Sequence, residues 1–174
     1  MSVSRICALI TSMLVLLVAA TAVAKVDQKG WPKITGKNKR HFFQAKQNGA
    51  NKDARITGTE TSDKILGAHG SDVLLGLGGI DVIFGDEIPN NPANQTDFID
   101  GGAGSDFIYG SHGKSTIIGG EGDDKIHARY GRGTISCGPG KDKVWQARKR
   151  RKNWKIAKDC EKITYALDKN QGRK

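Results

Sequence analysis

The sequence lacks the residue patterns on which most enzymes depend. It contains no H-E-x-x-H motif, no phosphate loop with glycine and lysine, and no arrangement of Ser, His and Asp that indicates a triad. Aromatic residues make up only 6% of the 174 residues, which is too few for a large aromatic core. The length allows one domain with short appendages. We therefore expect a single domain without catalytic activity.

The first 24 residues have the order of an export signal. Arg5 precedes the apolar residues 6–18, and Ala22-Val23-Ala24 is a small-x-small cleavage pattern, so we expect cleavage near Ala24. The alternative is a retained membrane anchor, because the apolar stretch 6–24 has a borderline length for spanning a bilayer. We expect a secreted, extracellular protein.

Cysteine is scarce, with three residues, and Cys7 lies inside this leader. Cys137 and Cys160 remain, and an even number of cysteines in an exported chain makes a disulfide the default expectation. A reactive thiol or a metal pair is the alternative, but neither cysteine has a supporting His or a second Cys nearby in the sequence.

Charge divides the rest of the chain into three parts. Residues 25–55 carry a net charge of +7, residues 56–145 of −6 and residues 146–174 of +8. In the first part, Trp31, Ile34, Phe42 and Phe43 are candidates to cap a repeat domain, and a flexible basic arm is the alternative. An acidic middle between two basic arms is the pattern to explain.

The acidic middle contains a repeat of nine residues. Its template is Gly, Gly, any, Gly, any, Asp, any, aliphatic, any, and G-G-A-G-S-D-F-I-Y and G-G-E-G-D-D-K-I-H are complete copies. Nine rows run from Gly58 to Trp145, and the fourth row has seven extra residues within 86–96. Each row predicts a glycine turn followed by a short strand. The aliphatic position is filled in all nine rows, by Ile65, Leu74, Ile83, Ile99, Ile108, Ile117, Ile126, Ile135 and Val144.

These rows resemble the RTX, or haemolysin-type, calcium-binding repeats. The resemblance implies an all-β fold, a right-handed parallel β-roll over residues 56–145 in which two rows form one coil. It also implies Ca²⁺ between adjacent turns on one side, held by aspartates and turn carbonyls. Calcium accepts such hard oxygen ligands in flexible geometry. The implied ligands are Asp63, Asp81, Gly102, Gly104, Asp106, Gly120, Gly122, Asp124, Asp142, Asp72 and Asp97.

If rows alternate between two sides, the aspartates are distributed unequally. The odd rows supply Asp63, Asp81, Asp106, Asp124 and Asp142, whereas the even rows supply Asp72, Asp97, Ser115 and Gly133. We expect up to four ions on the odd side and at most one, between Asp72 and Asp97, on the even side. Asp63 is the weakest candidate, because Thr61 replaces a template glycine.

The end of the chain carries a second resemblance. S-C-G-P-G-K-D-K-V followed by D-C-E-K-I is similar to the closing segment of secreted bacterial repeat proteins of this family. It implies a Cys137–Cys160 bridge that ties a C-terminal cap, residues 146–174, to the last row. The intervening Arg148, Lys149, Arg150, Arg151 and Lys152 form a basic run. This run either is a solvated loop or binds a polyanion, namely anionic polysaccharide, cell-wall polymer or a membrane surface; we expect no specific nucleic acid.

Two further sets of residues bear on other chemistry. Asp86, Glu87 and Asp97 in or beside the insertion are the paired carboxylates that a secreted hydrolase could use. His69 and His112 share one template position, but two coils separate them by about 10 Å, which is too far for one ion. We therefore favour a calcium-binding module with a structural or interaction role, and an adhesin that binds polyanions as the alternative.

Overall fold

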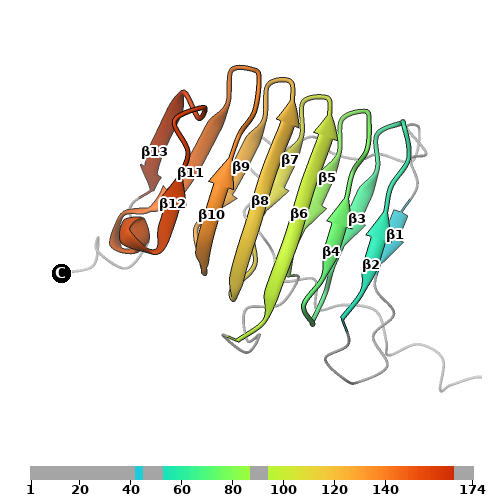
Figure 1. The fold of residues 1–174 in the computed structure, drawn as a ribbon, viewed down its shortest axis with the longest axis horizontal. Helices are drawn as coiled ribbons and strands as arrows, with labels where there is room; N and C mark the ends of the chain where they lie inside the picture. Colours follow the sequence, from blue (N-terminus) through green and yellow to red (C-terminus); the bar gives the residue numbers. More distant parts are fainter. Residues whose placement is uncertain (1–41, 45–52, 87–93, 167–174) are drawn as a thin grey trace, which may run out of the picture.

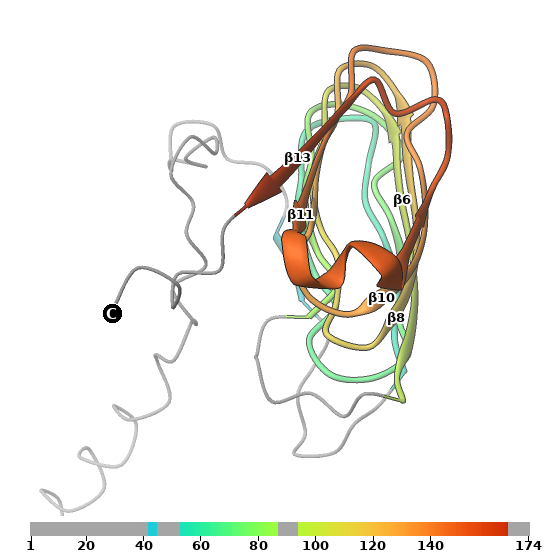
Figure 2. The same ribbon diagram turned by 90° about the vertical axis from the view of Figure 1, so that its left-hand side faces the viewer.

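The protein is an all-β solenoid made of two parallel sheets. The computed structural model describes residues 42–44, 53–86 and 94–166. Figure 1 shows the strands of one sheet in front of those of the other, and the end-on view in Figure 2 shows the chain winding around a flattened cross-section. The predicted parallel β-roll is confirmed.

The strands alternate between the sheets along the chain. The seven-stranded sheet has, in order, β1 Phe42–Gln44, β3 Lys64–Leu66, β5 Val82–Phe84, β7 Phe107–Tyr109, β9 Lys125–Ala128, β11 Lys143–Ala147 and β13 Lys162–Ala166. The six-stranded sheet has β2 Arg55–Thr57, β4 Val73–Leu75, β6 Thr96–Ala103, β8 Lys114–Glu121, β10 Arg132–Ser136 and β12 Trp154–Ile156. Two rows therefore make one coil.

The insertion in the fourth row does not disturb the strand register. Ile65 lies beside Ile83, at the spacing that two uninterrupted rows require. Leu74 lies beside Ile99, at a spacing lengthened by the insertion, so the turn before β6 accommodates the extra residues. The aliphatic positions consequently remain aligned in both sheets.

The larger of two hydrophobic clusters is a narrow core that runs along the solenoid axis. All nine predicted aliphatic side chains are at most 2% exposed. They form one cluster, to which Phe43, Ile56 and Ile156 add partly buried contacts at the ends. The predicted core is therefore confirmed, and its thinness means that the area it removes from water is small.

The stack extends beyond residues 56–145 at both ends. β1 and β2 add strands before Gly58, and β12 and β13 add strands after Trp145. Phe43, one of the expected capping residues, packs on the core, whereas Trp31 and Ile34 lie outside the described residues. The expected basic loop is instead a 3-10 helix, η2, Arg148–Asn153. Its position between β11 and β12 makes it the last described turn from the seven-stranded to the six-stranded sheet.

The outer face of the seven-stranded sheet carries an aromatic row. Phe84, Tyr109, His127 and Trp145 occupy the ninth template position of successive odd rows, and their neighbouring ring centroids are 4.6–5.1 Å apart. The ammonium groups of Lys125 and Lys143 lie 4.6 and 4.4 Å from the rings of Phe107 and Trp145. These contacts stabilise a sheet whose inner face offers few aliphatic side chains.

Two described turns contain a non-glycine residue with left-handed φ, Ala68 at 69° and Leu77 at 76°, and Leu77 has the larger side chain. Leu77 replaces the second template glycine, has φ of 76° and is 41% exposed. We expect Leu77→Gly to raise the free energy of unfolding by about 0.5 kcal/mol, because relief of left-handed strain exceeds the added freedom of glycine in the unfolded chain. Ile80 in the same turn is 45% exposed and has negative φ, so Ile80→Gly is expected to lower stability. Chemical denaturation of both variants measures the difference, and equal effects would contradict the assignment of strain to Leu77.

Candidate calcium sites

The turns from the six-stranded to the seven-stranded sheet form one edge of the solenoid, which we call the odd edge. Here the Oδ1 atoms of four of the five aspartates accept a hydrogen bond from the backbone N–H of the aspartate one coil earlier. The N–O distances are 2.7 Å from Asp63 to Asp81, 2.7 Å from Asp81 to Asp106, 2.8 Å from Asp106 to Asp124 and 2.8 Å from Asp124 to Asp142. All five side chains are at most 1% exposed. The bonds hold the carboxylates in a ladder.

The second carboxylate oxygen faces a space that only glycine leaves open. The Oδ2 atoms of Asp106, Asp124 and Asp142 are buried and have no hydrogen-bond partner. A Cβ atom at Gly101 would lie 2.5 Å from Asp106 Oδ2 and would also overlap the carbonyl oxygen of Gly119. A carboxylate oxygen and a backbone carbonyl oxygen therefore converge on Gly101, close enough to exclude a side chain there.

This convergence recurs along the odd edge and suits calcium. Equivalent pairs of oxygens lie beside Gly58, Gly76 and Gly119, each formed by the aspartate of the same row and the first residue of the next odd row. Buried oxygens without protein donors are the ligands that Ca²⁺ prefers. The residues that fit the ion are thus the ladder aspartates together with the carbonyls of Gly76, Gly101, Gly119 and Cys137.

Sequence reasoning named four other glycines of the same turns. Gly102, Gly104, Gly120 and Gly122 all have positive φ, and a Cβ at any of them would overlap backbone of the adjacent turn. The visible role of these four glycines is to let the turns stack. The Gly104 N–H donates to the carbonyl oxygen of Glu121, and the Gly122 N–H donates to the carbonyl oxygen of Pro139. The role of the four glycines as ligands stays a prediction. The sequence signal for the carbonyls that fit the ion is the first template glycine, which is present in four of the five odd rows.

The first rung differs from the others. Asp63 Oδ2 accepts hydrogen bonds from the backbone N–H of Thr59, at 2.6 Å, and from its hydroxyl, at 3.0 Å. An ion beside Gly58 would have to compete with these donors for the same oxygen. This geometry gives a physical reason for expecting the weakest site at Asp63.

The last rung was also missed. Glu161 accepts a hydrogen bond from Asp142 N–H at 2.7 Å, so it continues the carboxylate ladder beside β13. However, Cys137 supplies a side chain where the other odd rows have glycine, and it forms the expected disulfide with Cys160. The final gap is therefore closed by a covalent bond. Beside it, Asp123, Asp124, Asp142 and Glu161 line an open depression of about 560 Å³.

The opposite edge, which we call the even edge, has one comparable space. Beside Gly67, Asp72 Oδ2 and the carbonyl oxygen of Gly85 converge, and Asp72 N–H donates to Asp97 Oδ1 at 3.0 Å. Further along this edge serine replaces aspartate. The hydroxyl groups of Ser111 and Ser115 form a hydrogen bond with each other at 2.7 Å. In the same row, a Cβ atom added at Gly110 would lie 3.3 Å from a ring carbon of Trp154. The two edges thus differ in structure as they do in sequence.

Protons compete for the same carboxylates. Burial, joined by the charges of Asp106 and Asp142, raises the pKa of Asp124 from 3.8 to about 8. Burial likewise raises the pKa of Asp106 to about 6 and that of Asp72 to about 7. In calcium-free protein these groups favour folding below the unfolded value of 3.8, and the contribution is lost as pH rises through 6 to 8.

We therefore expect the calcium-free roll to melt at a lower temperature at pH 8 than at pH 5, and calcium affinity to rise over the same range. Thermal unfolding of resin-depleted protein and calcium titration at each pH provide the measurement. Asp124→Asn keeps a neutral side chain at all pH values and should flatten the dependence between pH 6 and 8. Stability of the calcium-free protein that increases with pH would contradict this expectation.

The remaining candidate residues lie apart from the odd edge. Asp86 is buried and accepts from His112 N–H at 2.9 Å, whereas Glu87 lies outside the described residues. His112 stacks on Tyr130, with ring centroids 4.7 Å apart. Residues Arg148–Lys152 of η2 are exposed on the even edge. Among the described residues, no helix is long and apolar enough to cross a membrane.

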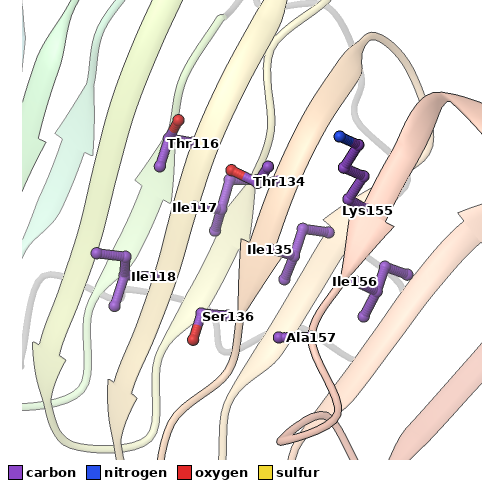
Figure 3. A pocket seen from close by; sticks show the side chains of 9 residues that line it. All are labelled: Thr116, Ile117, Ile118, Thr134, Ile135, Ser136, Lys155, Ile156 and Ala157. Atoms are coloured by element: carbon purple, nitrogen blue, oxygen red, sulfur yellow. The ribbon is translucent and has the colours of Figure 1, made fainter.

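A shallow groove of about 420 Å³ lies over β8, β10 and β12. Figure 3 shows its lining as three rows across these strands: Thr116, Thr134 and Lys155; Ile117, Ile135 and Ile156; Ile118, Ser136 and Ala157. The lining contains no carboxylate and no histidine.

A parallel β-solenoid with stacked, buried carboxylates in glycine turns is a β-roll of the calcium-binding class. The chain belongs to the family described as RTX calcium-binding nonapeptide repeat (4 copies), which it matches over residues 48–86, 94–126 and 113–143, just over half of its length. Ca²⁺ is the ion expected for these repeats. No curated protein and no solved structure matches the chain significantly.

Proposed function

We propose that this chain is an exported module whose folding depends on calcium and whose role is structural or interactive rather than catalytic. The observation that carries the proposal is the set of buried Oδ2 atoms on Asp106, Asp124 and Asp142, which no protein group satisfies. Burying an unpaired carboxylate costs several kcal/mol. A bound cation would offset that cost in each turn.

Export is supported by two independent features. The leader in residues 1–24 has the order of a secretory signal. The Cys137–Cys160 bond is of a kind that persists mainly in oxidising compartments. Free calcium outside cells is also high enough to fill sites with dissociation constants of about 10⁻⁴–10⁻³ M.

Calorimetric titration of the full chain with calcium tests the proposal. We expect up to four ions on the odd edge, one for each gap between neighbouring aspartates, and one more beside Gly67. Asp106→Asn should remove at least one of them, because it replaces the buried Oδ2 atom that has no protein partner, although the Oδ1 position can still accept from Asp81 N–H. Ser115→Ala changes the same template position on the even edge and should leave the count unchanged. Absence of binding, or equal losses in both variants, would sink the proposal.

A further inference from the structure

The odd edge and the C-terminal part of the even edge carry opposite charge. The odd edge, at the top in Figure 1, holds the carboxylate ladder, and η2 lies at the bottom, in the turn from β11 to β12. The preceding turn on the bottom edge contains Arg129 and leads into β10 at Arg132. We name Arg129, Arg132 and residues Arg148–Lys152 the basic edge. It occupies the C-terminal part of the even edge, where Ser115 and Gly133 replace the aspartates.

The basic edge is assembled around one exposed tyrosine. Tyr130 is 45% exposed, and the guanidinium carbons of Arg129 and Arg150 lie 5.7 and 6.0 Å from its ring centroid. On the adjacent turn, the His112 ring stacks on Tyr130. Burial and the charge of Arg150 lower the pKa of His112. Fixed aromatic packing thus brings together two arginines from different turns of the solenoid.

Five of these cations are not neutralised by the described part of the protein. Within residues 53–86 and 94–166, no carboxylate forms an ion pair with Arg129, Arg148, Arg150, Arg151 or Lys152. Asp86, the acidic residue beside His112, already accepts the His112 N–H. Like charges held close together repel, and a polyanion laid across them would convert that repulsion into attraction.

We propose that the basic edge binds a linear anionic glycan with carboxylate or sulfate groups. The cations lie on two successive turns, about 5 Å apart, and five of them follow one another along η2, so they form an extended surface that fits a chain rather than a compact anion. Five of the seven basic side chains are arginines, whose planar forks pair with carboxylate and sulfate through two hydrogen bonds.

The same residues fit other polyanions less well. The η2 helix contains only Arg, Lys and Asn, so it has no apolar side chain to enter a bilayer. Single-stranded nucleic acid is held by bases that stack on open aromatic faces. One face of Tyr130 is taken by His112, and the two arginines lie against the ring. This site is separate from the calcium ladder, so the proposal does not rest on the number of ions bound.

The test is a titration of the calcium-loaded full chain with a size-defined heparin oligosaccharide, repeated with oligogalacturonate. The variant is Arg129→Ala with Arg150→Ala. The matched control, Arg55→Ala with Lys141→Ala, removes the same charge from exposed residues on β2 and on the odd edge. We expect the affinity of the variant to fall about tenfold for each arginine and to depend less on salt, and the control to change by less than about twofold.

Two further arms decide between classes of partner. Vesicles of phosphatidylglycerol and phosphatidylcholine test a membrane surface, and a single-stranded oligonucleotide tests nucleic acid. Equal losses in the variant and the control would show unspecific charge attraction, and tighter binding of vesicles or oligonucleotide than of either glycan would assign another partner. Either result overturns the proposal. Circular dichroism of both double variants verifies that calcium-loaded folding is unchanged.

Discussion

Removal of calcium from this chain is expected to abolish most of its strand structure. At a free concentration of about ten times the dissociation constant, each ion adds about 1.4 kcal/mol. The odd edge has four gaps between neighbouring aspartates, so its ions together contribute about 6 kcal/mol. The whole stability of a small domain is only about 5–15 kcal/mol. The narrow aliphatic core buries too little area to replace the contribution of the ions.

Far-ultraviolet circular dichroism with and without a chelator measures this effect. We expect loss of the strand signal in chelator and its recovery when calcium is restored. Magnesium at the same concentration is the control, and it should not restore the signal, because it requires small, nearly octahedral sites and releases its waters reluctantly. A spectrum that is identical in calcium and in chelator would show that the roll folds without ions.

The fold could be predicted because every row repeats the same local instruction. The eighth template position is aliphatic even in the rows that have lost aspartate, such as those of Ile117 and Ile135, and both side chains are buried in the ladder. The insertion did not prevent this prediction, because a turn accommodates the extra residues and Leu74 still lies beside Ile99. The extra strands at both ends were not predicted, because no template glycine precedes β12 or β13 and only Gly49 precedes β2.

Only the parts of the site that lie at a fixed position within one row could be predicted. The ladder aspartates stand at a fixed template position, whereas the carbonyl oxygens that face them depend on how one coil is seated on the next. Glu161 was missed because its coil exceeds the template by a single position, as the pairing of Lys143 with Lys162 shows. The basic edge was recognised only as a run, because the contact of Arg150 with Tyr130 joins two turns.

The sharpest test of the difference between the two edges is a methyl group. Gly101→Ala would place a Cβ against Asp106 Oδ2, at 2.5 Å, and against the carbonyl oxygen of Gly119. Gly101 does not have positive φ, so the alanine backbone is acceptable and the effect arises from the filled space. Overpacking costs about 1–3 kcal/mol, and loss of the ion adds about 1.4 kcal/mol. We expect the free energy of unfolding in calcium to fall by about 3 kcal/mol.

Gly110→Ala is the matched control, because Gly110 has the same template position on the even edge. Its Cβ would meet only side-chain atoms within 3.4 Å, Ile117 Cδ1 at 3.1 Å and a ring carbon of Trp154 at 3.3 Å, and these can shift. We expect a loss of about 1 kcal/mol with an unchanged number of bound ions. Denaturant unfolding in saturating calcium and calorimetric stoichiometry report the two quantities separately. If Gly101→Ala bound as many ions as Gly110→Ala, the space beside Gly101 would not hold calcium, and the odd edge would owe its glycines to turn stacking alone.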